Sequence, residues 1–356
     1  MARIDELLRQ LEQRGGSDLH LAAGVPPHMR VRGELAVAED WDALSDAKLR
    51  ELLREVSSES DWQQFESSGD LDFAYGLEAV ARFRANFFVQ EHGAGAVFRI
   101  VPEEILSIED LKLPAAVESL CHLSEGLVLI TGPTGSGKST TLAAIIDCIN
   151  KTYCRHVVTI EDPVEFVHQN QASVLSHREV GTHTLGFASA LRAVIRQDAD
   201  VVLVGEMRDR ETIALALTAA EMGMLVFGTL HTNSAPKTID RIVDAFPAEE
   251  QNQIRVSLSE SLSGVVSQLL LPSADGQGRC ASHEILLRTP GLANVIREGN
   301  TPMLHSIIGS GKAIGMQTMD DALFALAEAG EVRPVDAHMK ASDKARFESL
   351  LGTAGQ

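Results

Sequence analysis

The chain has 356 residues, with 31 Lys and Arg against 50 Asp and Glu, which gives a formal net charge of −19. Its length allows two domains with separate cores. Such acidity disfavours, without excluding, sequence-independent DNA binding, because that binding depends on neutralising phosphates with Lys and Arg. No apolar run approaches the ~18 residues that a membrane-spanning helix needs, so we expect no direct membrane insertion.

The cysteines form no C-x-x-C pair and predict reduced, partly buried thiols in a cytosolic protein. They are Cys121, Cys148, Cys154 and Cys280. His177 and His183 lack a convincing set of partners, and we assign no metal site to them.

The first hundred residues predict a small α+β domain. Apolar residues at helical spacing, from Ile4 to Leu11, indicate an amphipathic helix. Further helices are predicted over 46–56 and 60–68, and strands over 17–24, 28–35, 70–75, 79–88 and 95–101, with a turn near Arg32 and Gly33. Because these elements do not alternate regularly, we expect an antiparallel sheet in a domain spanning 1–101. A linker is predicted over 102–112.

The pattern changes to alternating strands and helices in a second domain, which is predicted over 113–356. Strands are expected at 127–131, 156–161, 201–205 and 224–230, and helices near 138–150, 187–197 and 210–221. This alternation predicts an α/β domain, a parallel sheet with crossover helices. Beyond Pro247 we expect mainly helices with one further strand at 282–287, and after Pro334 a polar, loosely held chain.

A complete G-x-x-x-x-G-K-[ST] pattern is formed by Gly132, Gly137, Lys138 and Ser139. An apolar strand precedes it and a helix with an apolar face follows, which is the order that a phosphate-binding P-loop requires. The glycines let successive N–H groups and the helix N-terminus point at the phosphates. Lys138 is expected to reach the β- and γ-phosphates and Ser139 to ligate Mg²⁺. The predicted nucleotide-binding residues are Gly132, Pro133, Thr134, Gly135, Ser136, Gly137, Lys138, Ser139 and Thr140.

Polar residues follow three more predicted strands of this domain, at the position where open parallel sheets build their sites. The segment 159–165 places Glu161, Asp162 and Glu165 directly after a strand. Carboxylates at this position could activate water or hold the water shell of a metal ion. An acidic surface loop is the alternative.

The other two stretches end in Glu206 and in His231. Four apolar residues and Gly205 precede Glu206, which resembles a Walker B strand, although the usual residue is Asp; the longer side chain suggests contact with Mg²⁺ through water. His231 could hydrogen-bond the γ-phosphate or the attacking water. A surface Glu and a structural His are the alternatives.

Arginines alternate with Phe83 in the first domain. Arg82 and Arg84 therefore share one face of a strand, and Arg99 lies on another strand. Paired arginines could clamp a phosphate bidentately. From the residues alone, a solvated sheet face is the favoured interpretation.

Taken together, these stretches resemble the secretion-superfamily ATPases and, among them, the type IV pilus retraction ATPases. The resemblance covers nearly the whole chain, and the Asp and His boxes with GEMRD are far more specific than a P-loop alone. The matching stretches are GGSDLHLAAGVPPHMRVRGEL, RFRANFFVQEHGAGAVFRI, GPTGSGKST, TIEDPVEFVHQ as the Asp box, VLVGEMRDRETIALALTAAE as Walker B, GTLHTNSAPKTIDRIVDAFP as the His box, and GMQTMDDAL. PGLANVIREGN matches the retraction-linked C-terminal helix of the family only loosely.

This resemblance implies a PAS-like first domain, a flexible linker and a RecA-like ATPase domain. It also implies site roles that the spacing does not show. Glu165 would activate water, Glu206 would act through Mg²⁺, and His231 would lie near the γ-phosphate. The roles of Glu165 and Glu206 could be exchanged.

The same resemblance implies that Arg82, Arg84 and Arg99 approach the nucleotide like arginine fingers. The implied assembly is a cytoplasmic homohexamer at the inner face of the cytoplasmic membrane, which hydrolyses ATP to ADP and phosphate to power pilus retraction and twitching motility. Its implied partners are an inner-membrane platform protein and a paralogous retraction ATPase. The extra N-terminal domain and tetracysteine motif of extension-type relatives are missing, which favours a retraction enzyme.

Two other classes of protein remain open. A nucleic-acid motor is disfavoured by the net charge and by the lack of a basic, aromatic-rich loop. A non-hydrolysing, nucleotide-dependent scaffold is disfavoured because Lys138, Glu165 and Glu206 are all present.

Overall fold

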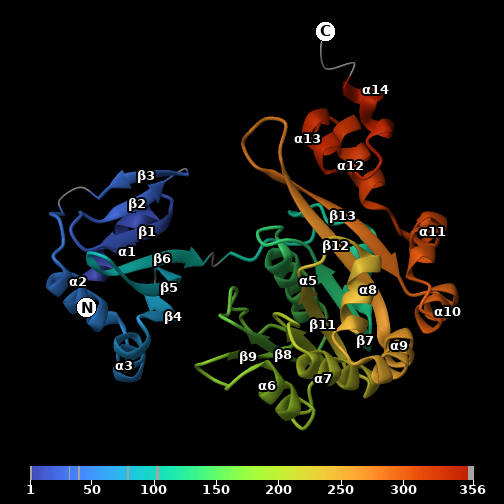
Figure 1. Ribbon diagram of the computed structural model, residues 1–356, viewed down its shortest axis with the longest axis horizontal. Coiled ribbons are helices and arrows are strands. Elements are labelled where there is room, and N and C mark those ends of the chain that lie inside the picture. The colour runs from blue at the N-terminus through green and yellow to red at the C-terminus, as the bar shows by residue number, and fades with distance from the viewer. Residues whose placement is uncertain (1, 32, 39–40, 78–79, 102–103, 352–356) are drawn as a thin grey trace. The chain divides into compact units, whose positions relative to one another are not determined.

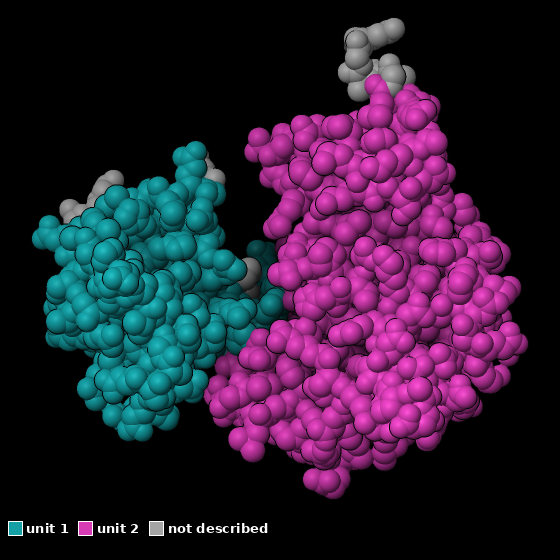
Figure 2. Space-filling model, in the orientation of Figure 1, with its two compact units in different colours: residues 1–104, 163–167 teal, residues 105–162, 168–356 magenta. Residues whose placement is uncertain are grey.

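The computed structural model describes residues 2–31, 33–38, 41–77, 80–101 and 104–351. The chain divides into two compact units, which Figure 2 colours separately. The first unit comprises 1–104 with 163–167, and the second unit comprises 105–162 with 168–356. Arg32 in a predicted turn, Ala79 at the start of a predicted strand and residues 102–103 of the predicted linker lie outside the described residues.

In the described residues, the first unit holds a six-stranded sheet in the order β3-β2-β1-β6-β5-β4 (Figure 1). Every neighbouring pair is antiparallel. The predicted α+β fold with an antiparallel sheet is therefore confirmed. The elements are α1 Ile4–Gln13, β1 Gly16–Ala22, β2 His28–Val31, β3 Glu34–Val37, α2 Asp46–Val56, α3 Glu59–Ser68, β4 Asp70–Leu77, β5 Ala81–Gln90 and β6 Gly93–Val101.

Strict alternation along β5 decides which side of this sheet is buried. Phe83 and Phe87 are fully buried, and Phe98 of the neighbouring strand joins the same core cluster. Arg82 and Arg84 occupy the intervening positions and so lie on the opposite face. The arginine face and the aromatic core are thus two sides of one strand.

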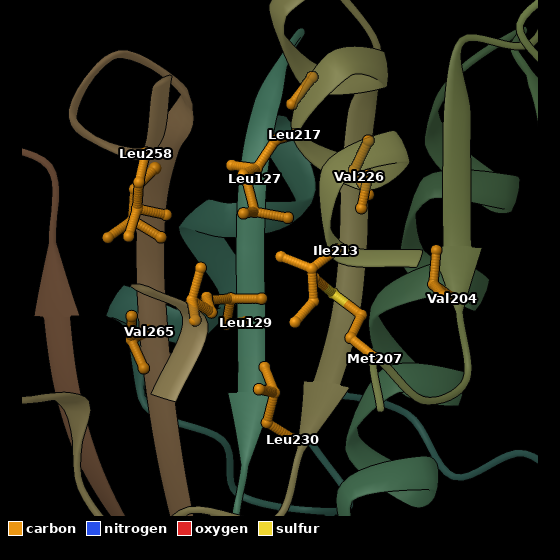
Figure 3. Close-up of a cluster of buried hydrophobic side chains, with 14 of the residues drawn as sticks. Leu127, Leu129, Val204, Met207, Ile213, Leu217, Val226, Leu230, Leu258 and Val265 are labelled. Carbon is orange, nitrogen blue, oxygen red and sulfur yellow. The ribbon is translucent and has the colours of Figure 1, made fainter. Parts of the chain in front are cut away.

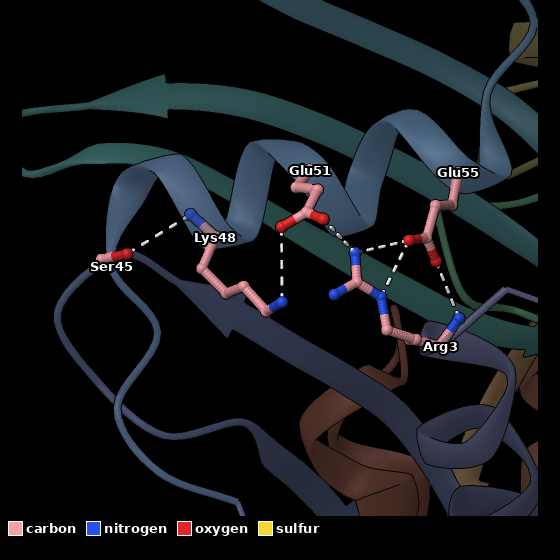
Figure 4. A network of polar contacts seen from close by, with 5 residues as sticks. All are labelled: Arg3, Ser45, Lys48, Glu51 and Glu55. Atoms are coloured by element: carbon pink, nitrogen blue, oxygen red, sulfur yellow. Dashed lines mark hydrogen bonds and ion pairs between the residues drawn. The ribbon is translucent and has the colours of Figure 1, made fainter.

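A polar network fixes the start of α1 against α2 (Figure 4). The Arg3 guanidinium donates from Nε to Glu55 Oε1 over 2.8 Å, and its Nη2 lies 2.8 Å from Glu51 Oε1. Lys48 Nζ lies 3.3 Å from the other oxygen of Glu51. These groups are largely exposed, so they orient the helices more than they stabilise them.

Among the described residues, the second unit holds a seven-stranded sheet in the order β13-β12-β7-β11-β10-β8-β9. All neighbouring pairs are parallel except β12 with β13. The strands are β7 Gly126–Thr131, β8 His156–Glu161, β9 Val174–Glu179, β10 Val201–Val204, β11 Leu225–Leu230, β12 Leu262–Pro272 and β13 Arg279–Leu287. The predicted parallel α/β sheet is confirmed, with one antiparallel edge strand added.

Helices cover this sheet, and they connect its strands. They are α4 Ala115–Glu118, α5 Lys138–Thr152, α6 Phe187–Val194, α7 Arg210–Glu221, α8 Ala235–Asp244, α9 Ala248–Ser261, α10 Pro290–Glu298, α11 Leu304–Ser310, α12 Met319–Glu328, α13 Pro334–Lys340 and α14 Glu348–Leu351, with short 3₁₀ helices at Ser119–His122, Thr301–Met303, Lys312–Ile314 and Ala345–Phe347. No helix within the described ranges is both long and apolar enough to cross a bilayer.

The central strand β7 is buried on both faces, which explains its uninterrupted apolar sequence. Leu127 and Leu129 face a cluster that includes Ile213 and Leu217 of α7 (Figure 3). Val128 and other alternate residues face a second cluster that includes the apolar side of α5. Strand β7 is therefore held from both sides at the point where the P-loop begins.

The region beyond Pro247 is mainly helical, as predicted, and the predicted strand at 282–287 lies within β13. Strand β12 was not predicted, although it pairs with both β13 and β7. A short apolar run does not distinguish a buried strand from a buried helix. The expectation of a loosely held chain after Pro334 was wrong for 334–351, since Phe347 is fully buried in a cluster with Leu323 of α12.

Candidate nucleotide-binding site

The predicted site segments follow neighbouring strands of the second unit. Strands β7, β11, β10 and β8 are consecutive in the sheet and parallel, so their carboxyl ends lie along one edge. The P-loop follows β7, and His231 follows β11. Glu206 follows β10 after Gly205. The fold thus places these three groups at one edge of the sheet.

Glycine backbone conformations shape the P-loop. Gly137 has φ 85° and ψ 17°, a left-handed conformation directly before α5 begins at Lys138. A left-handed residue joined to a right-handed helix turns successive N–H groups toward a common point. The helix N-terminus adds its own unpaired N–H groups and partial positive charge there. Together, these features form an anion-binding cradle.

The side chain of Lys138 lies over its own loop. Its Nζ donates to the carbonyl oxygen of Gly132 over 2.8 Å and to that of Pro133 over 3.1 Å. Pro133 is exposed, so the ammonium lies close to solvent at the mouth of the loop. The Lys138 ammonium could therefore exchange these carbonyl oxygens for the oxygens of a bound phosphate.

Glu206 is the centre of a charged cluster beside the P-loop. Its Oε1 lies 2.6 Å from Arg208 Nε and 3.1 Å from His231 Nε2. Burial raises the pKa of Glu206, but the hydrogen bond from Arg208 and the charges of Arg208, His231 and Lys138 outweigh burial and leave the pKa below its ordinary value. Glu206 is consequently ionised at neutral pH.

Hydrogen bonds between strand ends hold this cluster in place. The Thr229 hydroxyl of β11 donates to the carbonyl oxygen of Gly205. The backbone N–H of Met207 donates to the carbonyl oxygen of Thr229 over 3.0 Å. These bonds fix the backbone of Gly205 and Met207, the residues on either side of Glu206. The Glu206 carboxylate is therefore held by an ordered turn.

The Asp-box residues are divided between the two units. Glu161 ends β8 beside Gly205, whose N–H donates to the carbonyl oxygen of Ile160 over 2.8 Å. Asp162 also belongs to the second unit. Glu165 is exposed and lies in the segment 163–167, which belongs to the first unit.

The three predicted arginines all lie in the first unit, on adjacent strands. Arg84 of β5 is directly opposite Arg99 of β6 in the strand register. Arg99 Nε donates to Asp18 Oδ1 over 2.7 Å, whereas Arg84 Nε lies 3.8 Å from Asp72 Oδ1. Arg82 lies two residues before Arg84 on the same face, half-buried. The structure therefore forms one arginine-bearing face, as alternation predicts.

Asp18 orients Arg99 on this face. It is 4% exposed, and it lies opposite Arg99 in the pairing of β1 with β6. Burial raises the pKa of Asp18, but hydrogen bonds from Ser17 and Arg99 and the charge of Arg99 outweigh burial and keep that pKa below its ordinary value. Arg99 is thus oriented by a buried, ionised carboxylate.

Sequence reasoning missed Asp18, Arg208 and Gln268 as parts of these sites. Arg208 was within reach of sequence reasoning, because it lies in the GEMRD stretch two residues after Glu206. Gln268 had no local signal, since it lies on the unpredicted strand β12 and contacts the P-loop only after that strand pairs with β7. Within the described residues, no group of three or more His, Cys, Asp or Glu residues is arranged to hold a metal ion.

A P-loop on a central parallel strand, with a Glu–His pair at the ends of the next two strands, defines a P-loop nucleotide hydrolase. Comparisons with known proteins narrow this class. A family model described as "Type II/IV secretion system protein" matches residues 56–319. The chain therefore belongs to this family, and it is an ATPase.

Several relatives match over nearly their whole length. The chain is 48% identical over 344 residues to the type IV pilus retraction ATPase PilT of Pseudomonas aeruginosa, which covers 97% of this chain and 99% of PilT. It is 39% identical over 352 residues to the type IV pilus ATPase PilU of the same organism, which covers 98% of this chain and 92% of PilU. A crystal structure of the pilus retraction motor PilT with bound ADP superposes with a TM-score of 0.91, at 43% identity, over 98% of this chain and all of that one.

Proposed function

We propose that this ATPase is the motor that powers retraction of a type IV pilus, and hence twitching motility. The observation that carries the proposal is the ionised Glu206 beside His231, at the strand ends next to the P-loop. The 48% identity to PilT over almost the full length of both chains supplies the biological process. ATP is the substrate, and ADP and phosphate are the products.

The residues at the strand ends divide the chemistry between them. Gly132–Thr140 bind the phosphates through backbone N–H groups, and Lys138 moves from its own loop carbonyls to the phosphates. His231 hydrogen-bonds the γ-phosphate or orients the attacking water. Glu165 positions or activates that water; an exchange of roles with Glu206 is the competing assignment.

The P-loop and Glu206 fit a Mg²⁺ ion. Mg²⁺ is usually held by one or two protein oxygens together with phosphate oxygens and waters, so a larger protein cluster is not required. Ser139, at the start of α5, and the ionised Glu206 would supply these oxygens, Glu206 through water. The ion, when bound, neutralises charge that develops on the phosphates.

The arginines of the first unit complete the site in this proposal. Arg82, Arg84 and Arg99 stabilise the negative charge of the transferring phosphoryl group, as arginine fingers do. The first unit closes on bound ATP and reopens after product release, with the hinge in 102–112 between the domains 1–101 and 113–356. Six chains work in turn as a homohexameric ring.

The ring acts at the inner face of the cytoplasmic membrane, at the base of the pilus. Its partner there is an inner-membrane platform protein. A paralogue related to PilU is a second partner, and the higher identity to PilT than to PilU, 48% against 39%, favours the principal retraction enzyme over the accessory one.

Complementation of a strain that lacks its own retraction ATPase tests this function. The wild-type gene is expected to restore twitching, whereas Lys138→Ala is expected to restore none, because the variant lacks the cation that holds the β- and γ-phosphates. Lys237→Ala, on the exposed start of α8, is the matched control and is expected to restore it fully. The function is overturned if purified wild-type protein hydrolyses ATP but never restores retraction.

The two other classes of protein, a non-hydrolysing scaffold and a nucleic-acid motor, predict different results for the purified wild-type protein. A scaffold would bind ATP without turnover by the wild type. A nucleic-acid motor would show ATP hydrolysis that rises several-fold when single- or double-stranded DNA is added.

A further inference from the structure

Gln268 makes two buried hydrogen bonds to the nucleotide-binding segment. Its Nε2 donates to the carbonyl oxygen of Ser136 over 2.7 Å, and its Oε1 accepts from the Thr141 hydroxyl over 2.8 Å. The side chain is 3% exposed. It therefore joins the middle of the P-loop to the first turn of α5 from a strand more than a hundred residues away.

The bond to Ser136 fixes the orientation of one peptide group. In a trans peptide, the carbonyl oxygen and the N–H of the next residue point in opposite directions. Holding the Ser136 oxygen toward β12 thus turns the Gly137 N–H away from β12. Gly137 is the left-handed residue directly before α5, so this N–H belongs to the anion cradle.

The two motif glycines leave room for Gln268. A Cβ on Gly132 would collide with the backbone carbonyl oxygen of Gln268, and a Cβ on Gly137 would lie only 2.8 Å from its Nε2. Ser267, the preceding residue, pairs with Thr131 at the end of β7. The loop is consequently built directly against β12, and its glycines are required partly by this neighbour.

We propose that Gln268 is a positioning residue for nucleotide binding, which holds the Ser136–Gly137 peptide in the orientation that presents the Gly137 N–H to the phosphates. It does not touch the nucleotide, and it acts only through the loop. This assignment adds a positioning residue to the ATPase site. It rests on phosphate binding by the P-loop, but it does not depend on pilus retraction.

The test compares three variants of the full-length protein. Gln268→Met keeps the length of the side chain and removes both hydrogen bonds, and Gln268→Glu keeps the acceptor for Thr141 but removes the donor to Ser136. Ser267→Ala is the matched control, because Ser267 is a fully buried neighbour whose hydroxyl lies 2.9 Å from that of Thr131 and makes no bond to the loop.

We expect Gln268→Met to raise the Kd for ADP, measured by calorimetry, about tenfold, and Gln268→Glu to raise it at least as much. The KM for ATP should rise with the Kd. Hydrogen exchange of a peptide spanning 131–140 should quicken in both variants and stay unchanged in Ser267→Ala. The unfolding temperatures of Gln268→Met and Ser267→Ala should agree within a few degrees.

The proposal is overturned if Gln268→Met binds ADP within about twofold of Ser267→Ala. It is also overturned if Gln268→Met and Gln268→Glu lose ADP binding only together with a fall in unfolding temperature. Should Gln268→Met not fold, Thr141→Val carries the test: it frees the Oε1 end of the amide and should raise the Kd about threefold. An unchanged Kd in Thr141→Val would then overturn the proposal. Failure of the wild type to restore retraction, with ADP binding intact, counts against the proposed function alone.

Discussion

His231 Nε2 lies 3.1 Å from Glu206 Oε1, although the two residues follow different strands and are 25 positions apart. Strands β10 and β11 pair in parallel, so the residues that follow them reach the same edge of the sheet. The contact ties the Walker B carboxylate to the His box. The coupling free energy between the two residues can be measured from the ATPase rates of their variants.

We predict that Glu206 and His231 act as a unit in ATP hydrolysis. Glu206→Gln should lower kcat about 100-fold or more, and His231→Gln at least tenfold, with ADP binding in the absence of Mg²⁺ changed by less than a few-fold. The double variant should be little worse than Glu206→Gln, because residues that share one interaction are not additive. Steady-state ATPase rates of the wild type, the two single variants and the double variant give the double-mutant cycle. Glu221→Gln, at the exposed end of α7, is the control. Strict additivity would show that the contact has no catalytic role.

The Asp18–Arg99 pair is predicted to stabilise the first unit. Asp18→Asn should lower the free energy of unfolding by on the order of 1–3 kcal/mol. The reason is that Arg99 loses the buried carboxylate charge to which it donates. Asp72→Asn is the matched control, because that carboxylate is mostly exposed and 3.8 Å from Arg84, and it should cost less than ~0.5 kcal/mol.

Urea unfolding followed by tryptophan fluorescence reports this unit selectively. The two tryptophans of the chain, Trp41 and Trp62, both lie in the first unit. Equal losses in the two variants would contradict a special role for Asp18.

Two buried histidines predict acid sensitivity of the second unit. Burial lowers the pKa of His283 to about 4, and burial with the neighbouring charge of His177 lowers that of His168 to about 4. A folded pKa below the unfolded value of about 6.5 means that the unfolded chain binds more protons as the pH falls. The stability that these neutral rings confer is therefore complete above pH 6.5 and is lost progressively down to pH 4.

The expected loss is about 2 kcal/mol per histidine between pH 7 and pH 5. It is measured as the change in unfolding free energy by circular dichroism in urea. His283→Leu should roughly halve the pH dependence, whereas His92→Gln, at an exposed turn of the first unit, should leave it unchanged. A pH-independent wild type between 7 and 5 would refute this prediction.

The buried C-terminal cluster predicts that Phe347 stabilises the end of the chain. Phe347 is fully buried, and its ring centre lies 5.6 Å from that of Phe324. Phe347→Ala should cost on the order of 3 kcal/mol locally, because it removes a buried ring and leaves a cavity. Limited proteolysis with mass spectrometry should then show cleavage within 334–351 that the wild type resists. Leu185→Ala, at a side chain 97% exposed, should change nothing.

Local patterns in the amino-acid sequence were enough to predict several elements of the site. The P-loop follows from a glycine spacing and a lysine within nine residues, and β7 and β11 follow from short apolar runs that end at site residues. The edge at which Glu206 and His231 meet follows from the rule that parallel strands share their carboxyl ends. The arginine face of β5 follows from alternation, which involves only residues two apart.

The pairing of strands, and hence the contacts between distant residues, became visible only in the folded chain. Asp18 reaches Arg99 because β1 lies beside β6, and Gln268 reaches Ser136 because β12 adds to the edge of β7. Both contacts join residues that are far apart in the sequence. A local pattern reports how a segment buries its own apolar side chains, whereas the choice of neighbour depends on the whole sheet at once. For that reason, the phosphate cradle was predictable, and the glutamine that holds it was not.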